Sequence, residues 1–209
     1  ERKEAEKALK ITSDWLVRAK KEWENQSEKG YQGILFPIVQ GNFFEDLRQQ
    51  SAEFVASQDL PGIAIGGLSV GETGEEFTHF VNHTVKYLPE DKPKYVMGIG
   101  TPEYILDSVQ AGIDMFDCVL PTRNARNGSY FTHKGMLSIK QERWIHDFGP
   151  VDPECKCKVC QTYSRSYLRH LFKEQEILSS ILASYHNLYF LHNMIKEIMT
   201  GGTIDNNHL

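Results

Sequence analysis

The sequence predicts an α/β fold in which a parallel sheet is covered by helices and is followed by a smaller metal-binding region. Three observations support this prediction. Short apolar segments alternate with amphipathic ones, the strand-like segments are apolar on both faces, and three cysteines lie within six residues. Strands that are apolar on both faces are typical of parallel sheets with helical crossovers. Four such units, at spacings of roughly 30 residues, suit half of an eight-fold (β/α) barrel or a small open sheet.

The expected elements follow in order from the apolar pattern. Apolar positions at helical spacing, among them Leu9 and Trp15, predict an amphipathic helix over the first ~28 residues. The predicted parallel strands are 34–39, 62–65, 95–97 and 115–120. The helices after the first three are expected at 43–57, 75–87 and 101–111. Beyond them we expect short β segments at 129–132 and 136–139 and helices at 161–172 and 177–199. We therefore divide the chain into a barrel region, 1–127, and a metal-binding region, 128–209.

The composition limits the possible functions. A formal net charge of -5 and a pI of about 5.9 argue against binding nucleic acid through bulk positive charge, so any RNA contact must be local. The sequence has no apolar run of about 18 residues, and its charged N-terminus lacks the apolar core of a secretory signal. We expect a cytoplasmic protein without a membrane-spanning segment.

The cysteine cluster predicts a zinc site. Three thiolates, from Cys155, Cys157 and Cys160, suit a tetrahedral Zn²⁺ and leave the fourth position to a residue from elsewhere. The candidate histidines are His133, His146, His170, His186 and His192. We favour His186, since it lies on a helix expected to fold back beside the loop, giving C-x-C-x2-C-x25-H. Four protein ligands would make the zinc structural. The alternative is a set of reduced surface cysteines.

Asp117 is the candidate reactive carboxylate. It lies in the fourth apolar strand, where burying an unpaired carboxylate would be costly, and barrel active sites lie at the carboxyl ends of strands. A purely structural alternative pairs it with Arg123 or Arg126. The neighbouring Cys118 should point to the opposite face and pack, and Asp114 is expected to be a capping or loop residue.

Polar or glycine-rich segments follow the other three strands. They are Gln40-Gly41, Gly66-Gly67-Leu68 and Met97-Gly98-Ile99-Gly100. Glycine allows a planar ligand to approach the backbone, although each segment alone would also suit an ordinary turn. The segment 122–128 offers two guanidinium groups and amide side chains in what we expect to be a loop beside Asp117, which suits phosphates or base edges.

Taken together, the segments 66–72, 95–102 and 114–128 and the cysteine–histidine spacing resemble bacterial tRNA-guanine transglycosylase, from about Tyr31 to His186. The resemblance implies the second half of a (β/α)8 barrel followed by a zinc-binding subdomain with C-terminal helices. It also implies that Asp117 attacks C1′ of the ribose at the wobble guanosine of tRNA. Guanine then leaves, and 7-aminomethyl-7-deazaguanine resolves the covalent intermediate in queuosine biosynthesis. Two displacements at one sugar carbon preserve configuration, as in retaining glycosidases.

The same resemblance assigns the binding residues. Those around the base would be Gln40, Gly66, Gly67, Leu68, Val70, Glu72 and Met97, with Glu72 supporting the Gly67–Leu68 peptide. The neighbouring nucleotides would contact Gly98, Ile99, Gly100, Thr101, Pro102, Glu103, Tyr104, Thr122, Arg123, Asn124, Ala125 and Arg126. Valine at position 70, where the eukaryotic subunit has glycine, indicates the smaller bacterial base.

The chain also departs from the family pattern. Pro37 and Asn42 stand where glycine is common, and the family's N-terminal half, which carries a general acid/base aspartate, is not in this sequence. We therefore predict that the chain alone binds zinc without turnover. Two alternatives remain open: a non-catalytic, zinc-bearing RNA-docking or dimerisation module that uses Tyr163, Tyr167 and His170, as family homodimers do, and a zinc-dependent hydrolase.

Overall fold

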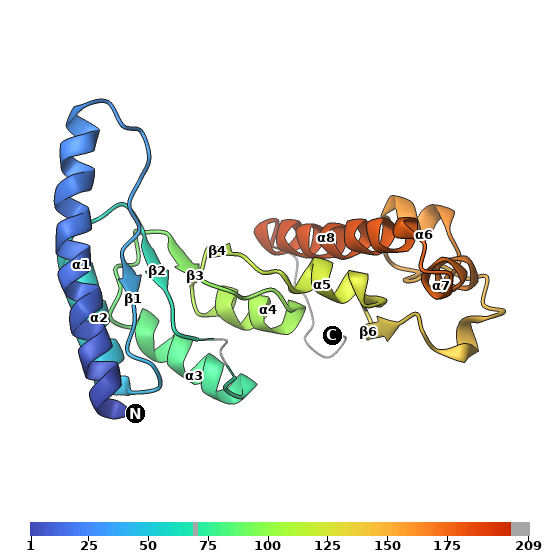
Figure 1. Cartoon of the computed structure of the whole chain (residues 1–209), viewed down its shortest axis with the longest axis horizontal. Coiled ribbons are helices and arrows are strands. Elements are labelled where there is room, and N and C mark those ends of the chain that lie inside the picture. Colours follow the sequence, from blue (N-terminus) through green and yellow to red (C-terminus); the bar gives the residue numbers. More distant parts are fainter. Residues whose placement is uncertain (69–70, 202–209) are drawn as a thin grey trace. The chain divides into compact units, whose positions relative to one another are not determined.

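The computed structural model describes residues 1–68 and 71–201 of the chain, which divide into two compact units. The first unit comprises residues 1–100 and 104–118, and the second comprises 101–103 and 119–209. The sequence-based division was drawn at 127/128. The units separate earlier because helix α5 (Leu120–Arg126) packs against the last helix, α8 (Ile177–Met199), which belongs to the second unit (Figure 1).

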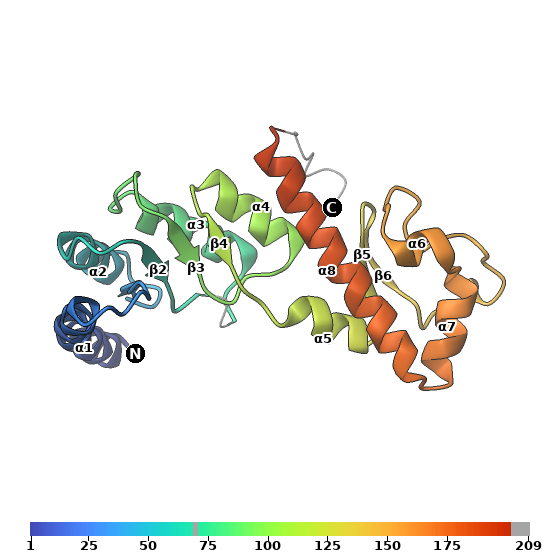
Figure 2. The ribbon, with the colours of Figure 1, turned by 90° about the horizontal axis from the view of Figure 1, so that it is seen from above.

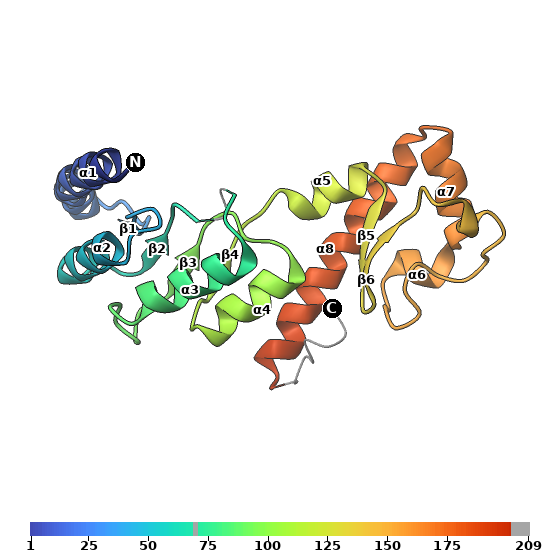
Figure 3. The same ribbon diagram turned by 90° about the horizontal axis from the view of Figure 1, so that it is seen from below.

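The first unit contains a four-stranded parallel sheet in sequential order. Its strands are β1 (Ile38–Val39), β2 (Ile63–Ile65), β3 (Lys94–Val96) and β4 (Met115–Phe116). Helices α2 (Glu45–Ser57), α3 (Gly74–Val85) and α4 (Pro102–Gln110) connect successive strands and lie along one side of the sheet (Figures 2 and 3). Sequential parallel strands with helices on one side are the arrangement of a (β/α) barrel, here over four strands, so the predicted fold class is confirmed.

The pairing register aligns residues across all four strands. Val39 pairs with Ile65, Ile65 with Val96, and Val96 with Phe116. The first three of these side chains are fully buried, so this row forms part of the apolar core. The preceding row alternates to the other face of the sheet and includes Tyr95, which is only half-buried.

Local sequence signals fix the helix ends. Helix α1 (Arg2–Glu28) buries Leu9 and Leu16, seven residues apart on one face. Helix α3 begins with a capping box, in which the Thr73 hydroxyl accepts a hydrogen bond from the Glu76 backbone and the Glu76 carboxylate accepts one from the Thr73 backbone. Each of these helices therefore has both a buried stripe and a defined start that can be read from the sequence.

The second unit is built around α8. It contains the antiparallel hairpin β5 (Ser129–Thr132) and β6 (Gly135–Ser138), the 3-10 turn η1 (Glu142–Trp144), α6 (Lys158–Thr162) and α7 (Arg165–Lys173). Asn187 of α8 is fully buried; its amide donates to Pro121 O (2.9 Å) and Ser129 O (3.0 Å), and its carbonyl accepts from Phe131 N (3.0 Å). One side chain thus ties α5 and the hairpin to α8.

Several elements differ from the sequence-based expectation. The first strand begins at Ile38 rather than at 34. The fourth strand ends at Phe116 rather than at 120, and the expected loop at 122–128 is largely helix α5, which has Pro121 in its first turn. The expected helix at 161–172 is two helices, because Ser164 caps the start of α7 by accepting a hydrogen bond from Tyr167 N. Among the described residues, no helix combines the length and apolar character needed to cross a membrane.

The buried row of the sheet yields a stability prediction. Ile65 is fully buried at its centre, so Ile65→Ala should lower the free energy of unfolding by about 2–5 kcal/mol. Ile34→Ala is the matched control because Ile34 is 65% exposed, and it should change the stability by no more than about 0.5 kcal/mol. Urea denaturation followed by circular dichroism measures both. Equal effects of the two substitutions would contradict the assigned core.

Candidate active site and metal centre

The four parallel strands bring one residue each to the same level at their carboxyl ends. The register continues one residue beyond the paired rows, since Gly66 N donates to Val39 O (3.0 Å) and Met97 N donates to Ile65 O (3.1 Å). This level carries the residues Gln40, Gly66, Met97 and Asp117. Three turns and one carboxylate that the sequence singled out separately therefore meet at one edge of the sheet.

Asp117 is exposed and oriented by two hydrogen bonds. The Tyr95 hydroxyl donates to its Oδ1 (2.5 Å), and Gly98 N donates to the same oxygen (3.0 Å). The Tyr95 hydrogen bond, followed by that from Gly98, lowers the pKa of Asp117, and the same contact raises the pKa of Tyr95. The carboxylate is therefore ionised at neutral pH.

The expected burial of Asp117 within an apolar strand is wrong, because β4 ends one residue earlier and the carboxylate lies beyond it. Arg123 and Arg126, considered above as partners, are on α5 in the second unit. Sequence reasoning also missed Tyr95. The feature that could have identified Tyr95 is its position two residues before Met97, on the same face of β3, which pairs with the strand that precedes Asp117.

The Gln40 side chain lies against the glycine turn after β2. A methyl group at Gly67 would come within 2.7 Å of Gln40 Oε1, and one at Gly66 within 3.1 Å of its Nε2. Gly67 also has φ +69°, a conformation that side chains rarely adopt. Glycine is therefore required at position 67, and the structure brings Gln40, Gly66 and Gly67 together as the sequence predicted.

Arg48 also supports this turn and was not predicted. It is fully buried on α2, its Nε donates to Asn42 O (2.6 Å), and its Nη2 donates to Gly66 O (3.1 Å) and Gly67 O (3.2 Å). Burial lowers the pKa of Arg48 to about 10, partly offset by the Glu72 carboxylate, so the guanidinium is still charged at neutral pH. Asn42, which replaces a common glycine, adopts φ +53°, within the region that glycine favours.

The remaining base-pocket candidates differ in accessibility. Met97 is 39% exposed, whereas Leu68 is buried, with an exposure of 4%. Glu72 is half-buried and its Oε2 accepts a hydrogen bond from Gly71 N (3.1 Å). Val70, the position expected to select the size of the base, lies outside the described residues.

The candidate RNA-binding residues fall into two segments. In the first, Gly98 binds Asp117, Ile99 is buried, and Gly100 packs so closely on Cys118 that a methyl group there would come within 2.2 Å of its Cβ. Cys118 is half-buried and its thiol donates to Gly98 O (3.4 Å). Cys118 therefore packs against the turn, as expected from the sequence.

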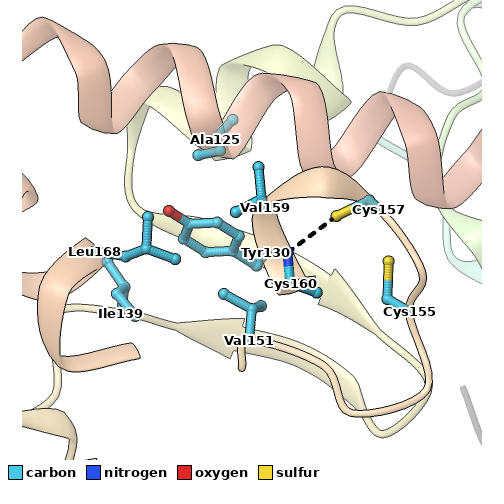
Figure 4. Close-up of a cluster of buried hydrophobic side chains, with 10 residues drawn as sticks. Ala125, Tyr130, Ile139, Val151, Cys155, Cys157, Val159, Cys160 and Leu168 are labelled. Atoms are coloured by element: carbon cyan, nitrogen blue, oxygen red, sulfur yellow. Dashed lines mark hydrogen bonds between the residues drawn. The ribbon is translucent and has the colours of Figure 1, made fainter. Parts of the chain in front are cut away.

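Thr101 precedes α4, on which Pro102 is buried, Glu103 is exposed and Tyr104 stacks on Phe77 at 4.8 Å. The second segment is α5, whose exposed and half-buried members are Thr122, Arg123, Asn124 and Arg126. Ala125 is buried in the core of the second unit (Figure 4), so its side chain packs on other protein atoms. Arg123 and Arg126, three residues apart, share a helical face.

The second unit gathers the predicted metal ligands. The sulfur atoms of Cys155, Cys157 and Cys160 lie 4.0, 3.4 and 3.4 Å from His186 Nδ1, and all four ligand atoms lie within 4.8 Å of one another. Tetrahedral zinc bonds of ordinary length would separate sulfur and nitrogen by about 3.6 Å. His186 Nε2 lies 2.7 Å from Phe131 O, which favours the tautomer with Nδ1 free to coordinate.

The cluster is buried, with exposures of 0% for Cys157 and His186 and below 10% for Cys155 and Cys160. Hydrogen bonds from the Cys155 and Cys160 thiols lower the pKa of Cys157, which favours a thiolate there. The alternative of unrelated surface cysteines is wrong. The donor set fits zinc, and these four residues could hold it.

Fold and site together define a (β/α)-barrel chain with a carboxylate at the carboxyl ends of its strands and a separate Cys3His metal centre. The model of the family described as queuine tRNA-ribosyltransferase matches residues 1–204, and the chain belongs to that family. Proteins of that name from Treponema denticola and Caldanaerobacter subterraneus are 57% and 49% identical to it over 91% and 92% of its residues. One from Streptococcus pneumoniae is 49% identical over 96%. The chain spans about half the length of these curated relatives.

The Tyr95–Asp117 contact predicts a change in titration. Tyr95→Phe removes the main hydrogen bond that stabilises the carboxylate, so the pKa of Asp117 should rise toward its ordinary value of 3.8. The stabilisation from this contact is complete above pH 3.8 and is lost as the pH falls through the lower folded-state pKa. Carboxyl ¹³C NMR titration measures the shift. Tyr104→Phe is the control, and an unchanged Asp117 in Tyr95→Phe would refute the assigned role.

The metal centre predicts one zinc ion per chain. Structural zinc contributes on the order of 10–16 kcal/mol to the folding of zinc-finger peptides, so Cys157→Ser should reduce the zinc content and unfold the second unit at a lower temperature. Elemental analysis and thermal denaturation test this. Cys118→Ser should keep its zinc, since Cys118 lies outside the cluster. Retention of a full equivalent by Cys157→Ser would exclude the proposed ligand set.

Proposed function

We propose that the protein to which this chain belongs exchanges the guanine at the anticodon wobble position of tRNA for 7-aminomethyl-7-deazaguanine, in queuosine biosynthesis. Family membership supports this proposal. The geometric observation that carries it is the position of Asp117, an exposed and oriented carboxylate at the same level of the sheet as Gln40, Gly66 and Met97. A reacting sugar and a bound base need this proximity.

The chemistry is a double displacement at one carbon. A carboxylate oxygen of Asp117 bonds to C1′ of the ribose while the C1′–N9 bond breaks, and guanine leaves with a proton at N9. The incoming base then loses its N9 proton and displaces the carboxylate, which restores the free enzyme and the original configuration at C1′. By resemblance, the general acid and base for these proton transfers belongs to the family's other half.

The hydrogen bonds of Asp117 support different roles for its two carboxylate oxygens in this mechanism. Both hydrogen bonds to Asp117, from Tyr95 and Gly98, end on Oδ1. We therefore assign the attack on C1′ to Oδ2, with Oδ1 anchored to β3 and its turn. The lowered pKa keeps the carboxylate ionised, which a nucleophile requires.

The base would lie in the pocket edged by the glycine turn after β2. The Gln40 amide, Met97 and the backbone of Gly66, Gly67 and Leu68 can bind a planar ring, with Glu72 near Arg48. Val70 would limit the size of that base. The flanking nucleotides would contact the segments Gly98–Tyr104 and Thr122–Arg126, consistent with local rather than bulk positive charge.

We propose that the Cys3His centre binds one structural zinc ion. Four protein ligands complete a tetrahedral shell and leave no position for a reactive water, which argues against a zinc-dependent hydrolase. The ion would hold the loop at 155–160 to α8 and so preserve the fold of the second unit.

Exchange should require the family's remaining half. Four strands provide one side of a pocket, and catalysis needs groups held on both sides of the base. We therefore expect the 209-residue chain alone to bind zinc without turnover, and expect activity when it is joined to the remaining half of the family domain, here called the joined domain. Such a protein would work in the cytoplasm, where its tRNA substrate is.

A second candidate function is a zinc-bearing module that docks RNA or a second copy of the chain. The observation in its favour is an exposed aromatic surface on the second unit, where Tyr163 and Tyr167 stack at 5.4 Å and Phe148 is 79% exposed. His170, on α7 with Tyr167, would extend this surface. The family's homodimers make this surface a candidate for dimer formation alongside catalysis.

The nucleophile predicts a trappable intermediate. In the joined domain, tRNA supplied without an incoming base should form an adduct that survives denaturing electrophoresis, and Asp117→Asn should abolish it and lower the exchange rate by at least about 10³-fold. Asp114→Asn is the matched control, because Asp114 accepts a hydrogen bond from Lys94 N (2.8 Å) that an amide oxygen can also accept. A docking module would be indifferent to both substitutions, and full activity of Asp117→Asn would exclude the proposed mechanism.

A further inference from the structure

Among the barrel-unit residues that the structure describes, Arg48 is the one large charged side chain that is completely buried next to the candidate site. Burying a charge is costly unless its hydrogen bonds are well satisfied. Here Nε and Nη2 donate to three backbone carbonyl oxygens, while Nη1 has no partner among the described residues. A buried charged side chain adds little to stability relative to an apolar one, so its presence here points to a role other than stability.

The hydrogen bonds of Arg48 fix two consecutive peptide groups. Its Nη2 donates to the carbonyl oxygens of both Gly66 and Gly67. In a planar trans peptide the C=O and N–H bonds point in opposite directions. The N–H groups of Gly67 and Leu68 must therefore point away from the guanidinium.

The turn needs such a constraint because glycine does not provide one. Gly67 has φ +69°, and two glycines in succession allow several orientations of the peptide between them. The Gln40 side chain lies close to both glycines, and Arg48 binds their carbonyl oxygens, so both side chains constrain the turn. On α2, Arg48 is also anchored to the preceding turn through Asn42 O (2.6 Å).

We propose that Arg48 is a positioning residue that keeps the N–H groups of Gly67 and Leu68 directed as donors toward a carbonyl oxygen on the edge of the bound base. The inference rests on the proposed function, since it assigns this turn to base recognition. A planar base with an oxo group would use these donors, whereas the same ring without the oxo group would not. Arg48 thus contributes to selectivity without touching the base.

The test compares guanine with 2-aminopurine, which lacks the oxo group and the N1 proton that accompanies it. Arg48→Lys keeps the charge but has a single nitrogen, which cannot bridge Asn42 O and the glycine carbonyls together. In the joined domain, the preference for guanine over 2-aminopurine, measured as a ratio of inhibition constants, should fall by about tenfold, the value of one hydrogen bond of about 1.4 kcal/mol. Arg48→Met should lower this preference by at least the same factor.

Val55→Ala is the matched control. Val55 is buried on the same helix, two turns beyond Arg48, so its truncation should lower the melting temperature and leave the ratio unchanged. If Arg48→Lys weakened the binding of both ligands equally and left the ratio of inhibition constants unchanged, the proposal would be overturned, because a merely structural residue affects the binding of both ligands alike.

A second measurement separates this proposal from the proposed function. In the 209-residue chain, the amide NMR signals of Gly67 and Leu68 should move in Arg48→Lys and stay in place in Val55→Ala. Unmoved signals in Arg48→Lys would overturn the positioning role whether or not the joined domain is active. An inactive wild-type joined domain that binds neither ligand would reject the proposed function and, with it, the base-recognition part of this inference.

Discussion

The parallel register of four short strands is the constraint on which the candidate site depends. Each paired row fixes the level of the next residue along every strand. Backbone pairing therefore brings Gln40, Gly66, Met97 and Asp117 to the same edge of the sheet. Backbone pairing is insensitive to side-chain identity, and the strands can therefore carry reactive residues just beyond their last buried row. This separation lets a rigid apolar core support polar chemistry.

Around that edge, hydrogen bonds within the protein orient the site residues. The Tyr95 hydroxyl and Gly98 N–H both hold one oxygen of Asp117, and Arg48 holds the glycine turn. Hydrogen bonds to charged groups are stronger than neutral ones, so both charges are restrained with few contacts. The two arrangements differ in environment: Asp117 is exposed, whereas Arg48 is buried and depends on backbone carbonyl oxygens.

The second unit combines a hydrogen-bonded core with the candidate metal centre. Besides α8 it contains only a short hairpin and short helices around a small core, and a bound metal ion can add stability to such a unit. Cys155 and Cys157 before α6 and Cys160 within it meet His186 of α8, whose other ring nitrogen binds Phe131 O in the hairpin. The same helix carries Asn187, which joins α5 and β5, so adjacent residues connect the metal centre and the hydrogen-bonded core.

The sequence by itself determined the alternation of strands and helices, the three cysteines of the candidate metal centre and the residues at the strand ends, because apolar periodicity, cysteine spacing and glycine placement are local properties. Only the tertiary structure decided where β4 stops, that 120–126 is a helix, and that Tyr95 binds Asp117 while Arg48 binds the glycine turn. An arginine four residues before Ala52 on the buried stripe of α2 was a visible signal. Its meaning depended on which backbone oxygens lay opposite, and that is a property of long-range packing alone.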